Sequence, residues 1–256
     1  MSYILTEIKN QVAVLTINRP EVLNAVDLSG AQELEKSIKA CLQNQAVGVI
    51  ILTGSGHKAF VAGADIKKMQ KMDSKQAEEF GIAGQSLTLT IENSPKPVIA
   101  AINGFALGGG CEISLACHIR IACEEARLAL PEVSLGILPG WGGTQRLPKL
   151  VGMGLAIEMI TTGRMISAAE GRRIGLINHV VPAEKLMGKA QEIAEIILKN
   201  GPNAIAAALK CLQAGEGLSI RDGLKIEQKY FAALFETREA KEGLSAFLGK
   251  RKPDFR

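Results

Sequence analysis

Apolar and polar positions along the first half of the chain predict strands and helices in turn. Residues 3–9 and 11–17 read as two short strands joined at Asn10, the second rich in Val and Ile, which is typical of a hairpin. Apolar side chains then recur every four residues over 34–42, which predicts a helix with one apolar stripe. A strand at 48–53 would complete a β-α-β-like unit.

The same pattern continues into the middle of the chain. Residues 54–65 and 103–110 contain glycines and predict loops, and a polar helical stretch follows the first of them. Residues 98–102 and 119–122 predict buried strands, and 112–117 predicts a short buried helix between them. Because strands and helices alternate through the first two thirds, we expect an α/β core.

The strand signal disappears near residue 185, and apolar residues at helical spacing dominate from there onward. Neither a low-complexity linker nor a convincing internal repeat separates the two parts. We therefore expect a core over residues 1–195 and a helical region over 196–256 that packs on the core or on a partner subunit.

The composition is that of an ordinary globular chain. Its 256 residues are 47% hydrophobic and 22% charged, which is sufficient for a full core. Thirty Lys and Arg against 26 Asp and Glu leave a formal charge of +4, too small to indicate a nucleic-acid or membrane partner. No apolar stretch approaches the ~20 residues of a membrane-spanning helix.

The N-terminus and the cysteines bear on location. Residues 1–17 lack the basic stretch and long apolar run of a signal peptide, so we expect a cytoplasmic protein. The five cysteines are odd in number and include no C-x-x-C pair. This usage favours buried free thiols over a disulfide framework or a zinc site.

Three segments place glycine or proline beside an acidic residue: 60–65, 108–112 and 130–132. The consecutive glycines at 108–110 let the backbone approach a ligand closely, and a helix starting there would direct free N–H groups and its positive dipole end outward. Such a place suits a developing oxyanion. The alternative for an isolated triple glycine is a tight turn or close helix packing.

Glu112 and Glu132 are the candidate acids. A lone glutamate in an α/β protein is usually a solvated or capping side chain. These two lie 20 residues apart, and each borders a glycine-rich loop or a proline. It is the combination that points to acid–base chemistry.

Seven segments spread over the chain form a recognisable series. They are Asn18-Arg-Pro, Leu23-Asn-Ala, Ala62-Gly-Ala-Asp-Ile, Asn103-Gly-Phe-Ala-Leu-Gly-Gly-Gly-Cys-Glu, Pro131-Glu, Pro139-Gly-Trp-Gly-Gly-Thr-Gln-Arg and Ser245-Ala-Phe-Leu-Gly-Lys-Arg-Lys. In order and spacing they resemble the enoyl-CoA hydratase/isomerase (crotonase) superfamily nearly end to end. The resemblance implies an α/β crotonase (ClpP-like) spiral of ββα units with a helical C-terminal trimerisation region. It also implies trimers, paired into hexamers.

The resemblance further implies a reaction: reversible syn hydration of a short-chain trans-2-enoyl-CoA to a 3-hydroxyacyl-CoA. In the family, the backbone N–H groups matching Ala64 and Gly109 form an oxyanion hole for the thioester oxygen. The acid matching Glu112 activates a water, and the one matching Glu132 exchanges a proton at Cα. Two carboxyls suit this reaction because two protons move, and no metal or redox cofactor is required.

Contacts to coenzyme A also follow only from the resemblance. Four positions match the adenine and pantetheine path or the surroundings of the catalytic water: Ala62, Asp65, Ile66 and Gly140. Three others match C-terminal positions that reach a coenzyme A bound by the adjoining subunit: Phe231, Phe247 and Lys250. Ordinary helix packing is the alternative for the phenylalanines, and a solvated basic tail is the alternative for the lysine.

The sequence departs from well-known hydratases at three places. Leu130 stands where a polar residue often precedes the Pro-Glu pair, which affects hydrogen bonding near Glu132. His118 stands where Asp is common, and we expect it to be hydrogen-bonded and structural. Trp141 replaces a small residue, and either narrows or covers the acyl pocket.

Other classes fit the sequence less well. The chain has no G-x-G-x-x-G after a strand and no G-x-S-x-G, which disfavours a dinucleotide-dependent dehydrogenase and a serine hydrolase. RNA binding through a lysine-rich helix is disfavoured because the charges over 33–42 balance to zero. An inactive scaffold would not need both acids. An enoyl-CoA isomerase or a cyclic dienoyl-CoA hydratase of the same superfamily remains the alternative.

Overall fold

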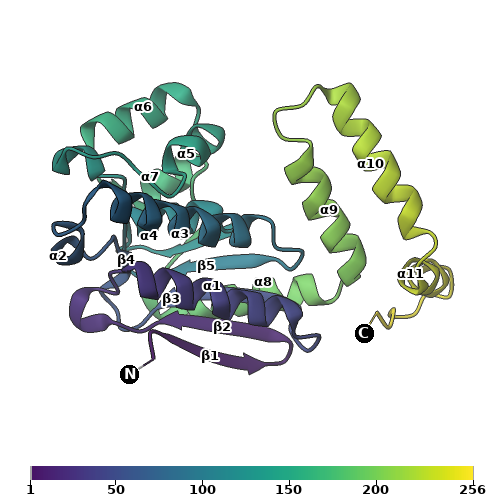
Figure 1. The fold of residues 1–256 in the computed structure, drawn as a ribbon. Helices are drawn as coiled ribbons and strands as arrows, with labels where there is room; N and C mark the ends of the chain where they lie inside the picture. Colours follow the sequence, from purple (N-terminus) through teal and green to yellow (C-terminus); the bar gives the residue numbers. More distant parts are fainter. Residues whose placement is uncertain (1, 256) are drawn as a thin grey trace.

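The computed structural model describes residues 2–255. Two sheets form the core, and a helical arm extends from it (Figure 1). The large sheet has the order β1-β2-β3-β5-β7-β10 and the small one β4-β6-β8-β9. The strands of the large sheet are β1 (Ile4–Lys9), β2 (Val12–Ile17), β3 (Val49–Gly54), β5 (Val98–Ile102), β7 (Ile119–Cys123) and β10 (His179–Val181). Those of the small sheet are β4 (Ala59–Ala62), β6 (Phe105–Leu107), β8 (Arg127–Ala129) and β9 (Ile166–Ser167).

Helices cover the sheets and build the arm. The α-helices are α1 (Leu28–Gln43), α2 (Ile66–Met69), α3 (Ser74–Glu92), α4 (Gly109–Ala116), α5 (Gly143–Val151), α6 (Met153–Thr162), α7 (Ala168–Arg173), α8 (Leu186–Leu198), α9 (Pro202–Ala214), α10 (Ile220–Leu234) and α11 (Arg238–Leu248). The short 3₁₀ helices are η1 (Pro20–Val22), η2 (Glu132–Leu135) and η3 (Ala183–Lys185).

Successive strands alternate between the two sheets, which gives the core its spiral. The strands β3, β5 and β7 lie side by side and parallel in the large sheet. Each is followed by a strand of the small sheet, β4, β6 and β8, which are also mutually parallel. Helical segments follow each pair of strands, so the unit is strand, strand, helix. This arrangement confirms the predicted α/β spiral of ββα units.

The central strands are apolar because helices cover both faces of the large sheet. Every residue of β3 and of β5 is buried. Helix α1 packs on β1 and β2, and α8 packs on β3, β5 and β7. A strand buried on both faces reads as a continuous apolar run, which is the pattern that predicted these strands.

The predicted hairpin is confirmed, and its turn residues Asn10 and Gln11 both have positive φ angles, 49° and 64°. Two predicted loops were wrong in part. The loop predicted at 54–65 contains β4, and the loop predicted at 103–110 contains β6. These strands have only four and three residues, too few for a periodic pattern to emerge.

Asp27 fixes the segment that follows β4. Its carboxylate caps α1 by accepting a hydrogen bond from the Gly30 N–H at 2.8 Å, and also accepts from Tyr3 Oη at 2.5 Å and from Lys68 Nζ. Burial alone would raise the pKa of Asp27, but these hydrogen bonds hold it well below its ordinary value. Asp27 therefore remains a carboxylate that joins α1 to α2.

The neighbour of Asp27 orients Ala64. The Val26 N–H donates to Gly63 O at 3.0 Å, and the Asp65 N–H donates to Val26 O at 3.1 Å. In such a parallel bridge the residue between the two bonded groups directs its own N–H to the opposite side. The Ala64 N–H consequently faces away from Val26.

The arm of α9, α10 and α11 extends away from the sheets (Figure 1). The Glu239 carboxylate accepts from the backbone N–H groups of Asn203 and Ala204, both at 2.9 Å, which ties the start of α11 to the start of α9. The predicted helical character after residue 185 is confirmed. Helix α8 crosses residue 195 and packs on the sheet, and the division into 1–195 and 196–256 stays a prediction.

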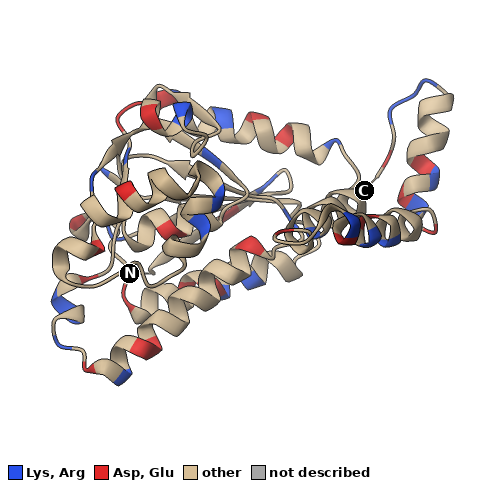
Figure 2. Cartoon of the chain, turned by 90° about the horizontal axis from the view of Figure 1, so that it is seen from above, with Lys and Arg blue, Asp and Glu red and all other residues tan. Residues whose placement is uncertain are grey.

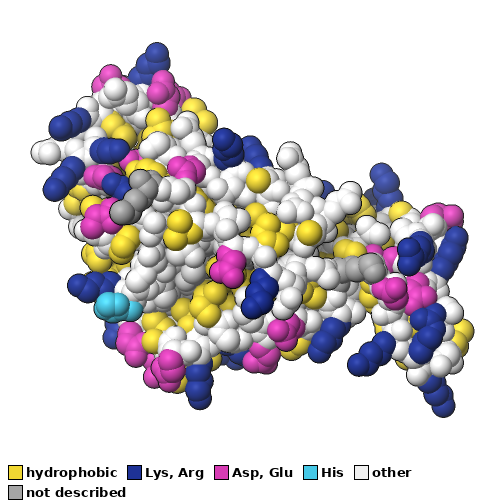
Figure 3. Space-filling view, turned by 90° about the horizontal axis from the view of Figure 1, so that it is seen from below, with side chains coloured by type: hydrophobic (Ala, Val, Ile, Leu, Met, Phe, Trp, Pro, Cys, Tyr) yellow, Lys and Arg dark blue, Asp and Glu magenta, His cyan; other side chains and the backbone are white. Residues whose placement is uncertain are grey.

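Charges of both signs are interspersed over the surface. Figure 2 shows Lys and Arg alternating with Asp and Glu over the core and the arm. Seen from below, both signs also gather at the end that α10 and α11 form (Figure 3). Within residues 2–255, no helix combines the length and apolar character needed to cross a membrane.

Candidate active site

The small sheet brings three segments to one edge. Ala62 pairs with Leu107, and Leu107 pairs with Ala129, in parallel register. Ala64, Gly109 and Glu132 follow these strand ends within a few residues, so they leave the sheet at the same edge. A methyl group added at Gly108 would lie 3.8 Å from Gly63 Cα and 2.9 Å from Glu132 Oε1. The structure therefore brings the predicted oxyanion segments and one acid together.

Glu112 lies in the first turn of α4, a helix in which every residue is buried. Its side chain is 2% exposed, and Oε1 accepts hydrogen bonds from the N–H groups of Trp141 at 2.7 Å and Gly143 at 2.8 Å. Burial raises the pKa of Glu112, while the two N–H donors and the charge of Arg146 act against that rise. The protein thus replaces part of the hydration that an ionised Glu112 would have in water.

Glu132 differs from Glu112 in its hydrogen bonding. It begins η2 directly after Pro131, and its Oε2 is buried without a hydrogen-bond partner among residues 2–255. Burial raises the pKa of Glu132 to about 7, and the negative charge of Glu112 adds to the rise. The pKa of both acids is raised, but two backbone N–H donors favour the carboxylate form of Glu112, whereas Glu132 Oε2 has no such donor among residues 2–255.

The two predicted backbone donors occupy positions where an N–H group is free. Gly109 is the first residue of α4, and the N–H groups of a first helical turn have no partner within the helix. Ala64 lies between β4 and α2, and the parallel bridge to Val26 turns its N–H away from Val26. Gly108 has a φ of 52°, which glycine adopts without strain.

The loop at 140–143, which surrounds Glu112, is hydrogen-bonded to α3. Gln85 Nε2 donates to Gly140 O at 3.0 Å, and Thr88 Oγ1 donates to Trp141 O at 2.9 Å. Arg146 Nη1 donates to the same Trp141 oxygen at 3.0 Å. These side chains were missed from the sequence. Their signal was a row of polar residues on one face of α3, at 85, 88 and 92, together with the unassigned Arg146 of the Pro139–Arg146 motif.

Trp141 is 3% exposed and packs inside the protein between α3 and α4. Its ring meets Phe80 edge to face, with ring centroids 5.1 Å apart. A methyl group at Gly84 would lie 2.1 Å from the indole, and one at Gly109 would lie 3.0 Å from it. The indole therefore buttresses the start of α4 and the predicted donor Gly109.

Of the other two departures, Leu130 is buried and His118 is half-buried. Leu130 is fully buried, and a methyl group at Gly143 would lie 2.9 Å from its Cδ1. His118 Nδ1 accepts from the Val98 N–H at 2.9 Å, while Nε2 lies 3.1 Å from Glu92 O. Burial lowers the pKa of His118. These contacts give His118 the expected hydrogen-bonded, structural role as a neutral imidazole.

The four positions predicted to line the coenzyme A path or the surroundings of the catalytic water lie beside this site. Ala62 ends β4, and Asp65 caps α2 and lies 3.8 Å from Arg19 in an ion pair. Ile66, the first residue of α2, is 50% exposed. Gly140 lies in the loop around Glu112, where its carbonyl accepts from Gln85.

The three C-terminal positions are on the arm, and a single chain does not bring them to the acid pair (Figure 1). Phe231 of α10 is 62% exposed and meets Phe235 with ring centroids 5.1 Å apart. Phe247 of α11 is 82% exposed, and Lys250 follows that helix with a φ of 50°.

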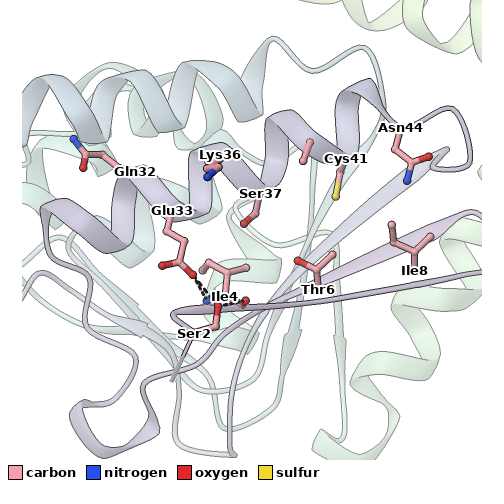
Figure 4. Close-up of a pocket in the computed structure, with 11 residues that line it drawn as sticks. Ser2, Ile4, Thr6, Ile8, Gln32, Glu33, Lys36, Ser37, Cys41 and Asn44 are labelled. Atoms are coloured by element: carbon pink, nitrogen blue, oxygen red, sulfur yellow. Dashed lines mark hydrogen bonds between the residues drawn. The ribbon is translucent and has the colours of Figure 1, made fainter.

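A groove of about 610 Å³ lies elsewhere, between β1 and α1 (Figure 4). Glu33 projects from α1 into it and accepts hydrogen bonds from Ser2 Oγ at 2.9 Å and the Ile4 N–H at 3.2 Å. These bonds hold the start of the edge strand β1. Among residues 2–255, no group of three or more His, Cys, Asp or Glu side chains could hold a metal ion.

The fold and the site define a class: an α/β spiral whose site holds one buried carboxyl, Glu112, and one half-buried carboxyl, Glu132. A family model described as Enoyl-CoA hydratase/isomerase matches residues 7–256. A Short-chain-enoyl-CoA hydratase of Clostridium acetobutylicum is 45% identical over 98% of this chain and 97% of that protein. A Crotonyl-CoA hydratase of Syntrophomonas wolfei is 46% identical over 98% of this chain and 97% of its own length.

A solved structure shares the fold. The crystal structure of an Enoyl-CoA Hydratase from Bacillus anthracis aligns with a TM-score of 0.96 at 42% identity, covering 99% of each chain. The chain belongs to the enoyl-CoA hydratase/isomerase family, and its fold is the crotonase fold.

The packing of Trp141 predicts opposite effects for two alanine substitutions in α3. Gly84→Ala places a methyl group within 2.1 Å of the indole and should destabilise the protein by about 1–3 kcal/mol. Gly81→Ala is the matched control, because a methyl there meets nothing within 4 Å and should stabilise the helix by roughly 0.5–1 kcal/mol. Chemical denaturation followed by the fluorescence of Trp141, the one tryptophan of the sequence, measures both. Equal stability of the two variants would contradict this packing.

Proposed function

We propose that the chain is an enoyl-CoA hydratase that adds water reversibly and syn across a short-chain trans-2-enoyl-CoA, giving a 3-hydroxyacyl-CoA. The observation that carries the proposal is the unequal hydrogen bonding of buried Glu112 and half-buried Glu132 at one edge of the small sheet. Glu112 Oε1 accepts from two backbone N–H groups, whereas Glu132 Oε2 has no partner in residues 2–255. The names of the similar proteins from C. acetobutylicum and S. wolfei support the same reaction.

Each acid has one proton to move. Ionised Glu112 takes a proton from water as the water oxygen bonds to Cβ, and protonated Glu132 delivers its proton to Cα. After this step the hydroxyl is bonded to Cβ, Glu112 carries the proton taken from water, and Glu132 is ionised. Exchange with water restores the starting state. In the reverse direction the same two groups exchange roles.

The backbone donors carry the charge that develops between these steps. As water adds at Cβ, negative charge moves onto the thioester oxygen as an enolate. The N–H groups of Ala64 and Gly109 are already oriented by the Val26 bridge and by α4, so they stabilise this oxygen without rearranging. Each such donor contributes about 10²–10³ in rate.

The substrate is an acyl-CoA thioester, whose coenzyme A would pass Ala62, Asp65 and Ile66, with Gly140 beside the attacking water. The chemistry needs no metal and no redox cofactor, because both protons and the enolate charge are handled by the chain itself. We place the protein in the cytoplasm, in fatty-acid β-oxidation or in butyrate and crotonyl-CoA metabolism.

Two alternative reactions of the same superfamily would make different use of this site. An enoyl-CoA isomerase moves a proton between two carbons and needs one acid, so the presence of both Glu112 and Glu132 favours hydration. A cyclic dienoyl-CoA hydratase would use both acids and differ in the acyl pocket. RNA binding is disfavoured by α1, where Glu35 pairs with Lys39 at 2.7 Å and Glu33 bonds to β1.

The first test is hydration of crotonyl-CoA, followed by loss of the enoyl-thioester absorbance. Glu112→Gln and Glu132→Gln should each lower kcat by about 10²–10⁴, because each removes one proton transfer. Glu124→Gln, at an exposed glutamate, is the matched control and should react like the parent. Parent activity on a 3-enoyl-CoA or a cyclic dienoyl-CoA alone would support the alternatives. Inertness toward every enoyl-CoA would refute the proposal.

The pH dependence provides a second test. Hydration requires Glu132 to start protonated, and its pKa is about 7, so kcat/KM should fall as the pH rises through about 7. Hydration consumes no net proton, so its equilibrium constant does not change with pH. The ratio of the forward to the reverse kcat/KM is therefore constant, and kcat/KM for dehydration must fall over the same range. The decline should vanish in Glu132→Gln and persist in Glu124→Gln. A parent profile that stays flat from pH 6 to 9 would contradict the assignment of Glu132.

We also propose that the chain assembles as a homotrimer, or as a homohexamer of two trimers, through the arm. Apolar side chains on the arm are strongly exposed in the single chain, among them Leu212 at 75% and Leu248 at 82%. Assembly would bury them, and it would bring Phe231, Phe247 and Lys250 to the coenzyme A of a neighbouring subunit.

The double variant Leu212→Asp and Leu248→Asp tests this assembly. Light scattering should give three or six times the chain mass for the parent and a lower mass for the variant, because buried charges oppose association. Met153→Asp on α6, at a residue 64% exposed, is the control and should keep the parent mass. A monomeric parent would contradict the proposal.

A further inference from the structure

Arg146 is a buried cation for which the mechanism above has no use. It lies on α5 with 8% of its surface exposed. Its guanidinium forms a bidentate ion pair with Glu92 of α3, with Nη2 2.7 Å from Oε2 and Nε 3.2 Å from Oε1. The third nitrogen, Nη1, donates to Trp141 O at 3.0 Å. Arg146 thus joins α3, α5 and the loop around Glu112.

The loop at 140–143 packs closely against the Arg146 guanidinium. A methyl group at Gly142 would lie 2.1 Å from Arg146 Nη1, and Gly142 has a φ of 106°. On either side of Gly142, the N–H groups of Trp141 and Gly143 both donate to Glu112 Oε1. Arg146 therefore holds the one turn of backbone that solvates the Glu112 carboxylate.

The charged groups near Glu112 come from few elements. The elements packed on α4 are α3, α5, β4 and β6. From α5 the facing group is Arg146, and from α3 it is Glu92, behind Arg146. Lys149 of α5 instead pairs with Glu216 at 2.8 Å, with both side chains nearly half exposed.

The remaining neighbours add one acid and one thiol. Strands β4 and β6 contain no titratable side chain. Glu132 on η2 faces Glu112 as the second acid. Cys111, next to Glu112 on α4, is buried, and burial raises the pKa of its thiol, so it stays neutral. Arg146 is therefore the cation that faces Glu112, and Glu92 is its counter-charge.

We infer that Arg146 is a positioning residue for Glu112: held by Glu92, it fixes the loop at 140–143 and keeps Glu112 ionised while Glu132 keeps its proton. This inference rests on the proposed hydratase function. It assigns a role to two side chains outside the acid pair and the oxyanion donors. Arg146 touches neither substrate nor reacting atom, and acts through Trp141 and Gly143.

The two charges of the pair have opposite effects on Glu112. Removing the Arg146 cation removes an attraction that favours the carboxylate, so Glu112 should titrate at higher pH. Removing the Glu92 anion leaves the cation less neutralised, so Glu112 should titrate at lower pH. A purely structural role for the pair would not produce shifts of opposite sign.

The experiment compares Arg146→Met, Arg146→Lys and Glu92→Gln in the full-length protein. Infrared difference spectra recorded against pH follow the carboxyl bands without substrate, and the Glu112 band is identified by its loss in Glu112→Gln. The acid limb of kcat/KM with crotonyl-CoA is measured in parallel. Arg164→Met is the matched control, because Arg164 also pairs with two acids, Glu158 at 2.8 Å and Glu170 at 2.9 Å.

We expect the Glu112 titration and the acid limb to move to higher pH in Arg146→Met and to lower pH in Glu92→Gln. Arg146→Lys should keep a titration close to that of the parent but lower kcat by about 10- to 100-fold, because an ammonium cannot hold Glu92 and Trp141 O together. Arg164→Met should change neither quantity.

Shifts of the same sign in Arg146→Met and Glu92→Gln, or no shift in either, would overturn the electrostatic role. A parent-like kcat in Arg146→Lys would overturn the positioning role. If Arg146→Met fails to fold, Glu92→Gln decides the electrostatic role, since the Glu92 side chain is 31% exposed and tolerates an amide. The infrared titration needs no turnover, so a failure of the proposed hydration is seen separately from a failure of this inference.

Discussion

The structure depends on keeping a buried carboxyl, Glu112, and a half-buried one, Glu132, in one site while giving them different environments. Two acids close together and shielded from water cannot both ionise at low cost, so the protein must determine which one carries the charge. It does so with backbone donors: Glu112 receives two N–H groups, and Glu132 receives none for Oε2. In the proposed hydration, this asymmetry sets the direction of proton transfer, from Glu132 and to Glu112.

The rest of the core serves this arrangement. The parallel strands β4, β6 and β8 of the small sheet end together, which places Gly109 and Glu132 at one edge. The central strands of the large sheet, buried on both faces, supply the rigid support. Helix α3 connects the core to the site. One face packs in the core, and Gln85, Thr88 and Glu92 hold the loop around Glu112, the first two directly and Glu92 through Arg146.

Much of this could be predicted from the sequence, for physical reasons that differ between elements. The hairpin and the first long helix have regular apolar periods, and the central strands are continuous apolar runs. The candidate acids were identified because their motifs match a family. The small sheet was missed because strands of two to four residues carry no period. The Arg146–Glu92 pair was missed because its members lie 54 residues apart, and spacing along a chain does not reveal a contact of that range.

The packing of Trp141 against Gly84 also limits how the sequence can change over evolution. A larger residue at 84 collides with the indole, whereas a smaller residue at 141 only leaves a space that neighbours can partly fill. Divergence at this pair therefore has a preferred order, in which position 141 shrinks before position 84 grows. In an alignment of relatives, the two positions should covary, and chimaeras that take α3 from one homologue and the Pro139–Arg146 loop from another should fail where that order is violated.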